Sequence, residues 1–246
     1  MSPRRRGRRK ALGQHYLIDP SVTAVMVGLA AIGQDDRVLE IGTGRGALTR
    51  DLARSSGHFE AFELDRTNYL ATKDLGLDNL LLHLGDAFSD SREFDILVSS
   101  LPYSESSNFV EWLSGHRYKR AVVLLQKDFV DKLLAQPGAD GYRAISVISQ
   151  ISSDVSPELD VVRESFDPSP KVSSEVVVIR PRHALSTDDV RLVKLLFSQR
   201  RRKLSGALKQ LGLRSREANP DQLSKRVQDL SSSEFLEVLG LIERDV

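Results

Sequence analysis

A glycine-rich turn and two acidic residues follow successive apolar runs, and together they could bind a nucleoside. The turn reads Glu40-Ile41-Gly42-Thr43-Gly44-Arg45-Gly46. Glycines let the backbone pass close to a ligand at the carboxyl edge of a sheet. Glu63 ends the next apolar run, and Asp86 follows the one after it. A carboxylate at the first position can accept hydrogen bonds from both ribose hydroxyls, and one at the second from an adenine amine. The order predicts a nucleoside site rather than separate surface turns.

The spacing of the glycines argues against a dinucleotide. The pattern is GxGxG, because Gly46 is followed by Ala47 and Leu48. Sites for NAD and FAD carry GxGxxG and a second nucleotide-binding half, and no such half follows Asp95. A methyl donor with one nucleoside therefore fits better than a dinucleotide.

The next apolar run ends in the motif Ser100-Leu101-Pro102-Tyr103. It resembles the (Asn/Asp/Ser)-x-Pro-(Tyr/Phe/Trp) motif of methyltransferases that act on exocyclic amino groups of nucleic-acid bases. The adenine amino nitrogen is a poor nucleophile, because its lone pair is delocalised into the ring. Two oxygen acceptors, one from a side chain and one from the backbone, can hold its hydrogens, while an aromatic ring stacks on the extruded base. Direct attack on a sulfonium methyl then needs no covalent enzyme intermediate.

Strand and helix patterns alternate around these motifs. Strands are expected at Arg37–Ile41, Phe59–Glu63, Leu80–Leu84, Phe94–Ser99 and Ala121–Gln126, with further β-rich runs at Ala144–Ile151 and Val176–Arg180. Helices are expected at Pro20–Ile32, Gly46–Ser56, Arg66–Asp74 and Ser106–Ser114. This alternation predicts a Rossmann-like α/β fold, with a mainly parallel sheet covered by helices on both faces.

The character of the chain changes after Pro181, where only helical patterns follow. These are expected at Asp188–Gln199, Lys203–Leu211, Pro220–Leu230 and Ser233–Ile242, with serines 231–233 as candidate caps of the last helix. We therefore expect a basic N-terminal arm (1–19), an α/β domain (20–183) and a small all-helical domain (184–246).

Composition bounds the class of protein. The chain has 246 residues, of which 40% are hydrophobic, and no cysteine. Disulfides, thiolate metal sites and cysteine nucleophiles are thereby excluded, and we expect no metal site. No apolar run approaches the roughly 20 residues that span a membrane, and the N-terminus is too charged for a secretory signal. A cytoplasmic protein without membrane association fits these features.

Two basic clusters stand out in a chain whose formal net charge is only +1. They are Arg4, Arg5, Arg6, Arg8, Arg9 and Lys10 near the start, and Arg200, Arg201, Arg202 and Lys203 after the first C-terminal helix. The rest of the chain is therefore acidic. Concentrated positive charge on an acidic body favours a polyanionic partner, such as RNA, although a solvated tail and a solvated helix face stay open.

Motifs along nearly the whole chain resemble one family, the KsgA-type small-subunit ribosomal RNA adenine dimethyltransferases, which are relatives of the erythromycin-resistance methylases. Beyond the motifs above, the similar segments are Gly13-Gln14-His15-Tyr16-Leu17, Leu125-Gln126-Lys127, Gly141-Tyr142, Phe166-Asp167-Pro168-Ser169-Pro170-Lys171-Val172 and Phe197-Ser198-Gln199-Arg200-Arg201-Arg202-Lys203. The resemblance implies a class I methyltransferase domain followed by a helical domain that contacts RNA.

The resemblance also implies the ligands and the site. The methyl donor would be S-adenosylmethionine, and the substrate would be small-subunit rRNA in a pre-ribosomal particle, dimethylated at N6 of adenines near its 3′ end by a monomer. Residues implied to bind the donor are Gln14, His15, Leu17, Gly42, Gly44, Glu63, Asp86, Ala87 and Ser100. Residues implied to act on the target base are Ser100, Leu101, Pro102, Tyr103 and Phe166.

One departure from the family leaves alternatives open. The family usually has asparagine where this chain has Ser100. A non-catalytic ribosome-assembly factor that kept the fold would explain that change. A large-subunit rRNA methylase of the erythromycin-resistance type shares the motifs and the size. A transcription factor with a methyltransferase-like fold, as among mitochondrial relatives, is a further alternative, but no transit-type arm is present.

Overall fold

The computed structural model describes residues 15–215 and 219–243. Its internal contacts divide the chain into two compact units. The first contains the described residues up to Phe109 together with His116–Val130 and Val155–Pro181. The second contains Val110–Gly115, Asp131–Asp154 and the described residues from Arg182 onwards. Within the described residues, no helix is long and apolar enough to cross a membrane.

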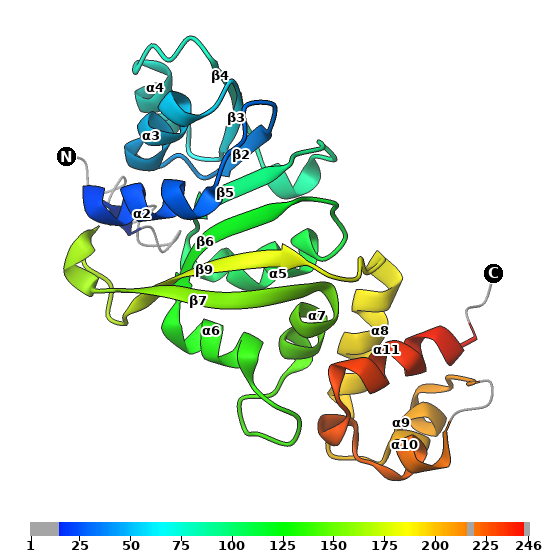
Figure 1. The fold of residues 1–246 in the computed structure, drawn as a ribbon. Coiled ribbons are helices and arrows are strands. Elements are labelled where there is room, and N and C mark those ends of the chain that lie inside the picture. Colours follow the sequence, from blue (N-terminus) through cyan, green and yellow to red (C-terminus); the bar gives the residue numbers. More distant parts are fainter. Residues whose placement is uncertain (1–14, 216–218, 244–246) are drawn as a thin grey trace. The chain divides into compact units, whose positions relative to one another are not determined.

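A seven-stranded sheet in the order β4-β3-β2-β5-β6-β9-β7 forms the centre of the first unit (Figure 1). The strands are β2 (Arg37–Ile41), β3 (His58–Glu63), β4 (Leu80–Leu84), β5 (Ile96–Ser100), β6 (Arg120–Gln126), β7 (Ser153–Val161) and β9 (Ser174–Pro181). The five strands from β4 to β6 run parallel, and β9 pairs with β6 in the antiparallel direction. The α/β architecture predicted from the alternating pattern is confirmed.

The strand order reverses between β2 and β5. From β2 the chain adds β3 and β4 on one side, then returns to place β5 and β6 on the other. At such a switch point the loops after the two central strands diverge, which opens a crevice at the carboxyl edge of the sheet. The glycine-rich turn follows β2 and the Ser100–Tyr103 motif follows β5, so both predicted motifs lie at this point.

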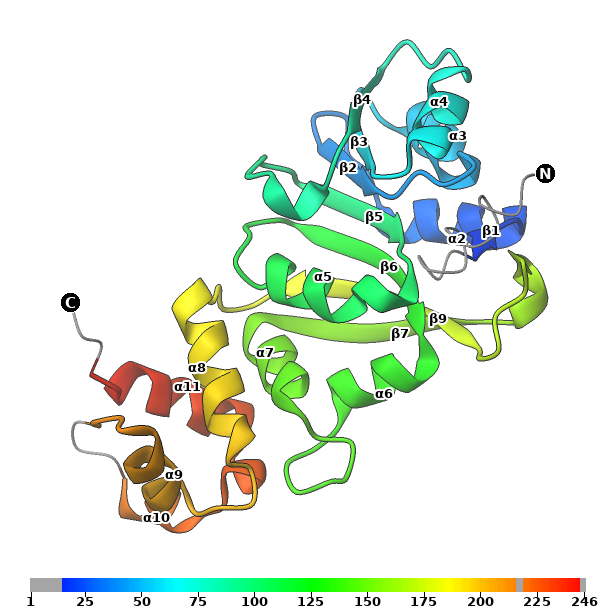
Figure 2. The ribbon, with the colours of Figure 1, turned by 180° about the vertical axis from the view of Figure 1, so that it is seen from behind.

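Helices cover the sheet on both faces (Figures 1 and 2). The helices α2 (Pro20–Ala30), α3 (Ala47–Ser55) and α4 (Arg66–Lys73) belong to the first unit, while α5 (Ser106–Leu113) and α6 (Lys127–Leu134) begin in it and continue into the second. Met26 of α2 and Leu52 of α3 are fully buried and pack with Val38, Phe59 and other strand residues in one core cluster. Asp19 caps α2 by accepting from the backbone N–H of Ser21 at 3.0 Å, and Pro20 occupies its first turn.

The β-rich prediction for Ala144–Ile151 is wrong, because this segment forms the helix α7 (Ala144–Ser152). Its β-branched residues favour a strand locally, but Val147, Ile148 and Ile151 are all buried in the helix. Tertiary packing thereby overrides local propensity. The backbone N–H of Arg143 donates to Ser146 Oγ at 2.9 Å at the start of the helix. The strand comes directly afterwards, as β7.

The C-terminal part of the second unit contains the helices α8 (Thr187–Ser198), α9 (Leu204–Leu211), α10 (Pro220–Ser224) and α11 (Ser232–Leu241). Phe197 of α8 and Phe235 of α11 stack with ring centroids 6.1 Å apart. Ser231 caps α11 by accepting from the backbone N–H of Glu234 at 3.2 Å. The prediction of an all-helical C-terminal part is confirmed.

The helix predicted over Pro220–Leu230 is too long. It ends at Ser224, and a separate short turn covers Val227–Asp229. The intervening backbone bonds elsewhere: Leu204 N–H donates to Lys225 O at 2.8 Å, and Val227 N–H donates to Arg202 O at 2.9 Å. These bonds tie the segment to the basic turn between α8 and α9 and end the helix.

Candidate active site

The turn between β2 and α3 needs its glycines. Gly42, Gly44 and Gly46 have φ angles of 79°, 55° and 77°, a region that other residues rarely adopt. A Cβ atom on Gly44 would lie 3.2 Å from the ring of Tyr16, and one on Gly46 would lie 2.7 Å from Leu75 Cδ1. The turn therefore depends on glycine both for its backbone conformation and for the closeness of its neighbours.

Glu63, at the end of β3, braces this turn. One carboxylate oxygen accepts from Gly44 N–H at 2.9 Å, and the other accepts from Asp65 N–H at 2.8 Å. Glu63 is buried, and burial raises the pKa of its carboxyl group while the two backbone N–H groups lower it. A buried carboxylate at this edge, with lone pairs beyond those two bonds, can accept hydrogen bonds from ribose hydroxyls.

Glu40 is an acid that the sequence analysis quoted within the motif but to which it gave no role. It lies inside β2 and is 1% exposed, and its Oε2 atom accepts no hydrogen bond from any described residue. Burial, with the nearby charge of Glu63, raises the pKa of Glu40 to about 8. The signal in the sequence was an acidic residue between the apolar residues Leu39 and Ile41 of this strand. Its unpartnered oxygen can accept from an N–H group of a ligand.

One pocket brings together much of the predicted donor site. It is lined by His15, Tyr16, Leu17, Glu40, Gly42, Thr43, Gly44, Arg45, Ala47, Leu48 and Ser100. Its volume of about 40 Å³ is small, so this enclosed part can hold one end of a donor but not all of it. The glycine turn, the segment before α2 and the end of β5 thus meet around a single cavity.

Asp86 and Ala87 do not line that cavity. Asp86 follows β4 and accepts from Phe88 N–H at 3.0 Å, while Ala87 is buried. Beside them, Gly85 N–H donates to Glu63 O at 3.0 Å, so this segment adjoins the end of β3. Gln14 lies outside the described residues, as do Arg4, Arg5, Arg6, Arg8, Arg9 and Lys10.

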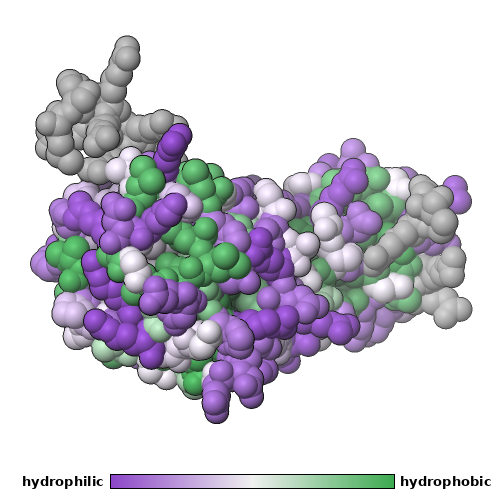
Figure 3. Space-filling model, turned by 90° about the horizontal axis from the view of Figure 1, so that it is seen from above, coloured by the Kyte–Doolittle hydropathy of each residue, from purple (hydrophilic) through white to green (hydrophobic). Residues whose placement is uncertain are grey.

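Leu64 is a second residue that the sequence analysis missed. It follows Glu63 directly and is 65% exposed. Figure 3, which looks onto the β3–β4 end of the sheet, shows hydrophobic surface between polar side chains. A flat purine could cover such a side chain while its ribose reaches Glu63.

The Ser100–Tyr103 motif begins at the last residue of β5. Ser100 is the last residue of the strand, Leu101 is buried, and Tyr103 begins a short turn that leads into α5. The ring of Tyr103 stacks on that of His15, with centroids 5.5 Å apart and planes at 30°. Tyr103 Oη lies 2.6 Å from Ser174 Oγ. The aromatic ring of the motif is therefore half-buried and restrained beside the donor pocket.

A short two-stranded sheet joins two of the segments whose sequences resemble the family, the one that contains Tyr16 and the one that begins at Phe166. β1 (Tyr16–Leu17) pairs with β8 (Phe166–Asp167), and Leu17 lies opposite Phe166. Phe166 is 4% exposed and packs in the core, so its predicted contact with a target base stays a prediction. Arg45 contacts both strands: its guanidinium lies 2.6 Å from the Asp167 carboxylate and 4.4 Å from the centroid of the Tyr16 ring.

The second basic cluster lies in the turn between α8 and α9. Arg201, Arg202 and Lys203 are exposed, Arg200 is partly exposed, and none of the four forms an ion pair with another described residue. Two backbone bonds from the Val227–Gln228 segment hold the turn. Cationic side chains on a fixed turn, without acidic partners, suit contacts with phosphates.

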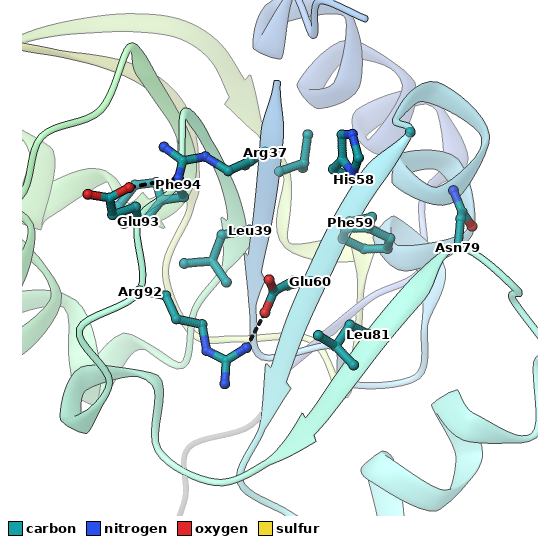
Figure 4. Close-up of a pocket in the computed structure, with 12 residues that line it drawn as sticks. Arg37, Leu39, His58, Phe59, Glu60, Asn79, Leu81, Arg92, Glu93 and Phe94 are labelled. Carbon is teal, nitrogen blue, oxygen red and sulfur yellow. Dashed lines mark hydrogen bonds and ion pairs between the residues drawn. The ribbon is translucent and has the colours of Figure 1, made fainter. Parts of the chain in front are cut away.

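A different cavity, of about 290 Å³, contains none of the predicted site residues (Figure 4). It lies against β2, β3 and β4, and its lining includes Leu39 of β2 and Leu81 of β4. Its charged groups pair with each other: Arg92 with Glu60, and Arg37 with Glu93 at 2.8 Å. Size alone therefore does not identify the active site of this chain.

Comparison with known proteins identifies the family. A family model described as ribosomal RNA adenine dimethylase matches residues 5–243. A ribosomal RNA small subunit methyltransferase A from Prochlorococcus marinus is 36% identical, with 91% of this chain and 89% of the relative covered. The enzyme of the same name from Phenylobacterium zucineum is 34% identical, with 83% and 77% covered.

A solved structure agrees with these relatives. A dimethyladenosine transferase from Plasmodium falciparum superposes with a TM-score of 0.78 at 26% identity, covering 93% of this chain and 99% of that one. The match extends over both the sheet and the C-terminal helices. Since the family model and the relatives span nearly the whole sequence, the chain belongs to the ribosomal RNA adenine dimethylase family.

Proposed function

We propose that this protein transfers methyl groups from S-adenosylmethionine to N6 of adenines near the 3′ end of small-subunit ribosomal RNA, two to each base. The substrate would be a pre-ribosomal particle. Family membership and the names of its relatives support this activity. We propose further that the protein acts in the cytoplasm, as a monomer.

One observation carries the proposal. The glycine turn after β2 and the Ser100–Tyr103 motif after β5 lie at the switch point of the sheet, and Ser100 shares a pocket with Gly42 and Gly44. A donor bound along the turn would therefore present its methyl group close to the motif that holds an amino group. Neither motif alone would distinguish this arrangement from an ordinary turn.

The residues present fit the donor. Glu63 would accept from the ribose, Asp86 would accept from the adenine amine, and the exposed side chain of Leu64 would lie against the purine. At the other end, the unpartnered oxygen of Glu40 and the carbonyl groups of the glycine turn would accept from the ammonium group of the methionine part. S-adenosylmethionine would supply an electrophilic methyl group on a sulfonium: the N6–methyl bond forms as the methyl–sulfur bond breaks, S-adenosylhomocysteine leaves, and N6 loses one proton to solvent. The protein would bind and orient the donor and the base.

The Ser100–Tyr103 motif would prepare the nucleophile. In the first transfer, Ser100 Oγ and a backbone carbonyl of Leu101 or Pro102 would accept from the two N6 hydrogens, which draws the nitrogen lone pair out of conjugation with the ring. In the second transfer, one of these acceptors would hold the one remaining N6 hydrogen. Tyr103 would stack on the extruded adenine. Alignment of the nitrogen with the sulfonium methyl would lower the barrier to such a direct transfer.

The experiment uses immature small and large ribosomal subunits, each incubated separately with the protein and S-adenosylmethionine labelled in its methyl group. Label is expected in small-subunit RNA only. Label in large-subunit RNA instead would select the erythromycin-resistance type of activity. Binding of small subunits without transfer of label would select a non-catalytic assembly factor.

A further inference from the structure

The ring of Tyr103 is held at its far end by a residue distant in sequence. Its Oη atom lies 2.6 Å from Ser174 Oγ, and Ser174 is fully buried. Ser174 is the first residue of β9 and pairs with Gln126, the last residue of β6. Because β9 runs antiparallel to β6, its first residue lies at the carboxyl edge of the parallel strands, where the motif after β5 also lies.

This bond restrains one of the two side-chain torsions of the tyrosine. Rotation about χ1 swings the whole ring and carries Oη away from its partner, so a bond to a buried hydroxyl opposes it. Rotation about χ2 spins the ring around the axis through Cβ and Oη, and leaves Oη in place. The bond to Ser174 therefore fixes where the Tyr103 ring lies but not which way its faces point.

A second contact restrains the other torsion. The His15 ring lies against one face of Tyr103, with centroids 5.5 Å apart and planes at 30°. His15 Nδ1 is itself 2.7 Å from the carbonyl oxygen of Pro168. A ring restrained in this way opposes the spin of Tyr103 about χ2. The two contacts together restrain the plane of Tyr103, and His15 covers one of its two faces.

We propose that Ser174 is a positioning residue for methyl transfer, because its buried hydroxyl holds the Tyr103 ring where the target adenine stacks. This inference rests on the proposed function of Tyr103. With its hydroxyl bonded to Ser174, Tyr103 would meet the base through its ring face. Ser174 itself would not touch the base, and its effect would pass through Tyr103 alone.

The test is a double-mutant cycle of Ser174→Ala and Tyr103→Phe, with methyl transfer to immature small subunits as the readout. Each single change removes the same hydrogen bond and is expected to lower kcat about three- to tenfold. The double variant should be no slower than the slower single variant, because only one interaction is lost. The KM and the calorimetric Kd for S-adenosylmethionine should be unchanged in all three variants.

The neighbouring Ser173 provides a matched control, since its backbone carbonyl accepts from Lys127 N–H at 3.1 Å and Ser173→Ala leaves that bond in place. Ser173→Ala should transfer methyl groups at the wild-type rate. Wild-type kcat in Ser174→Ala, or multiplied losses in the double variant, would overturn the inference. So would a loss of donor affinity and thermal stability in proportion to kcat, which indicates a purely structural serine. An inactive wild-type protein would instead overturn the proposed function itself, and the inference with it.

Discussion

In the proposed reaction, Ser100 would determine how the target nitrogen is held. A serine hydroxyl can accept a hydrogen bond, as an asparagine amide oxygen can, but its reach from the backbone is one bond shorter. The base must therefore approach more closely, or a water must bridge the gap. The backbone carbonyl that follows does not depend on the side chain. The chain thus keeps both acceptors of the motif, one of them on a shorter arm.

Substitutions at the motif should separate these contributions. Ser100→Ala should lower methyl transfer, and Ser100→Asn should preserve or raise it. Tyr103→Ala should cost more than either, because it removes a stacking platform worth roughly 1–3 kcal/mol per base. Rates of methyl transfer to immature small subunits check the order. A Tyr103→Ala variant as active as the wild type would remove the ring from the account.

Glu40 should make stability depend on pH. Burial raises its pKa to about 8 from an ordinary 4.5, so between these values the folded protein keeps a proton that the unfolded chain has lost. The free energy of unfolding that Glu40 contributes therefore falls as pH rises through this window. Glu40→Gln cannot ionise. The free energy of unfolding of the Glu40→Gln variant, minus that of the wild type, should therefore increase with pH, by at most about 1.4 kcal/mol per pH unit.

Urea denaturation between about pH 5 and 8 measures this difference. The exposed Glu164 offers a control, because Glu164→Gln removes a carboxylate from the surface and should keep a nearly constant difference from the wild type. A constant difference for Glu40→Gln over the same range would show that Glu40 is ionised in the folded protein.

At the scale of elements, substitution of a glycine in the turn after β2 tests whether the backbone conformation of that turn requires glycine. Gly46 has a φ of 77°, and Leu75 Cδ1 near it is the tip of a flexible side chain, so conformational strain is the larger cost. Gly46→Ala should destabilise the protein by about 1–2 kcal/mol. Gly28→Ala, on α2 with open space around it, should stabilise it by roughly 0.5–1 kcal/mol. Thermal unfolding of both variants should give shifts of opposite sign, and shifts of the same sign would contradict the argument.

The elements that the sequence predicted well are those whose pattern and burial agree. Arg37–Ile41 forms a strand with the predicted bounds, and its apolar residues are buried in the parallel sheet. Leu80–Leu84 also has the predicted bounds, but it is the edge strand and is only partly buried. The β-rich prediction for Ala144–Ile151 was wrong, because its β-branched residues are buried on a helix, α7. The pairing of Tyr16–Leu17 with Phe166–Asp167 could not be foreseen, because two-residue strands have no periodicity.

For the site, the motifs predicted which loops surround the pocket but not every side chain to which a role is proposed here. Ser100, Gly42 and Gly44 meet around one pocket as their positions after neighbouring strands implied. Ser174 was not singled out, because a serine at the start of a strand carries no signal of its own, and its bond to Tyr103 arises only from the register of β9 with β6. Glu40 had a signal, its acidity within an apolar run, which only burial made interpretable.

At the scale of the whole molecule, charge is concentrated where RNA contact is proposed. Replacing Arg200, Arg201 and Arg202 by glutamine should weaken binding to immature small subunits and leave donor affinity intact. Each lost phosphate contact should reduce the slope of log K against log salt by about 0.7–0.9. The exposed arginine Arg54, on α3, serves as a control through Arg54→Gln. Equal slopes for wild type and triple variant would mean that the cluster is only a solvated surface.

The most direct measurement of the central claim is the chemical identity of the product. Immature small subunits are incubated with the protein and S-adenosylmethionine, and the RNA is then digested to nucleosides and examined by mass spectrometry. The account predicts N6,N6-dimethyladenosine from a fragment near the 3′ end, formed by the wild type and strongly reduced by Tyr103→Ala. Methylation at a ring nitrogen, at a ribose hydroxyl or at a base other than adenine would contradict it.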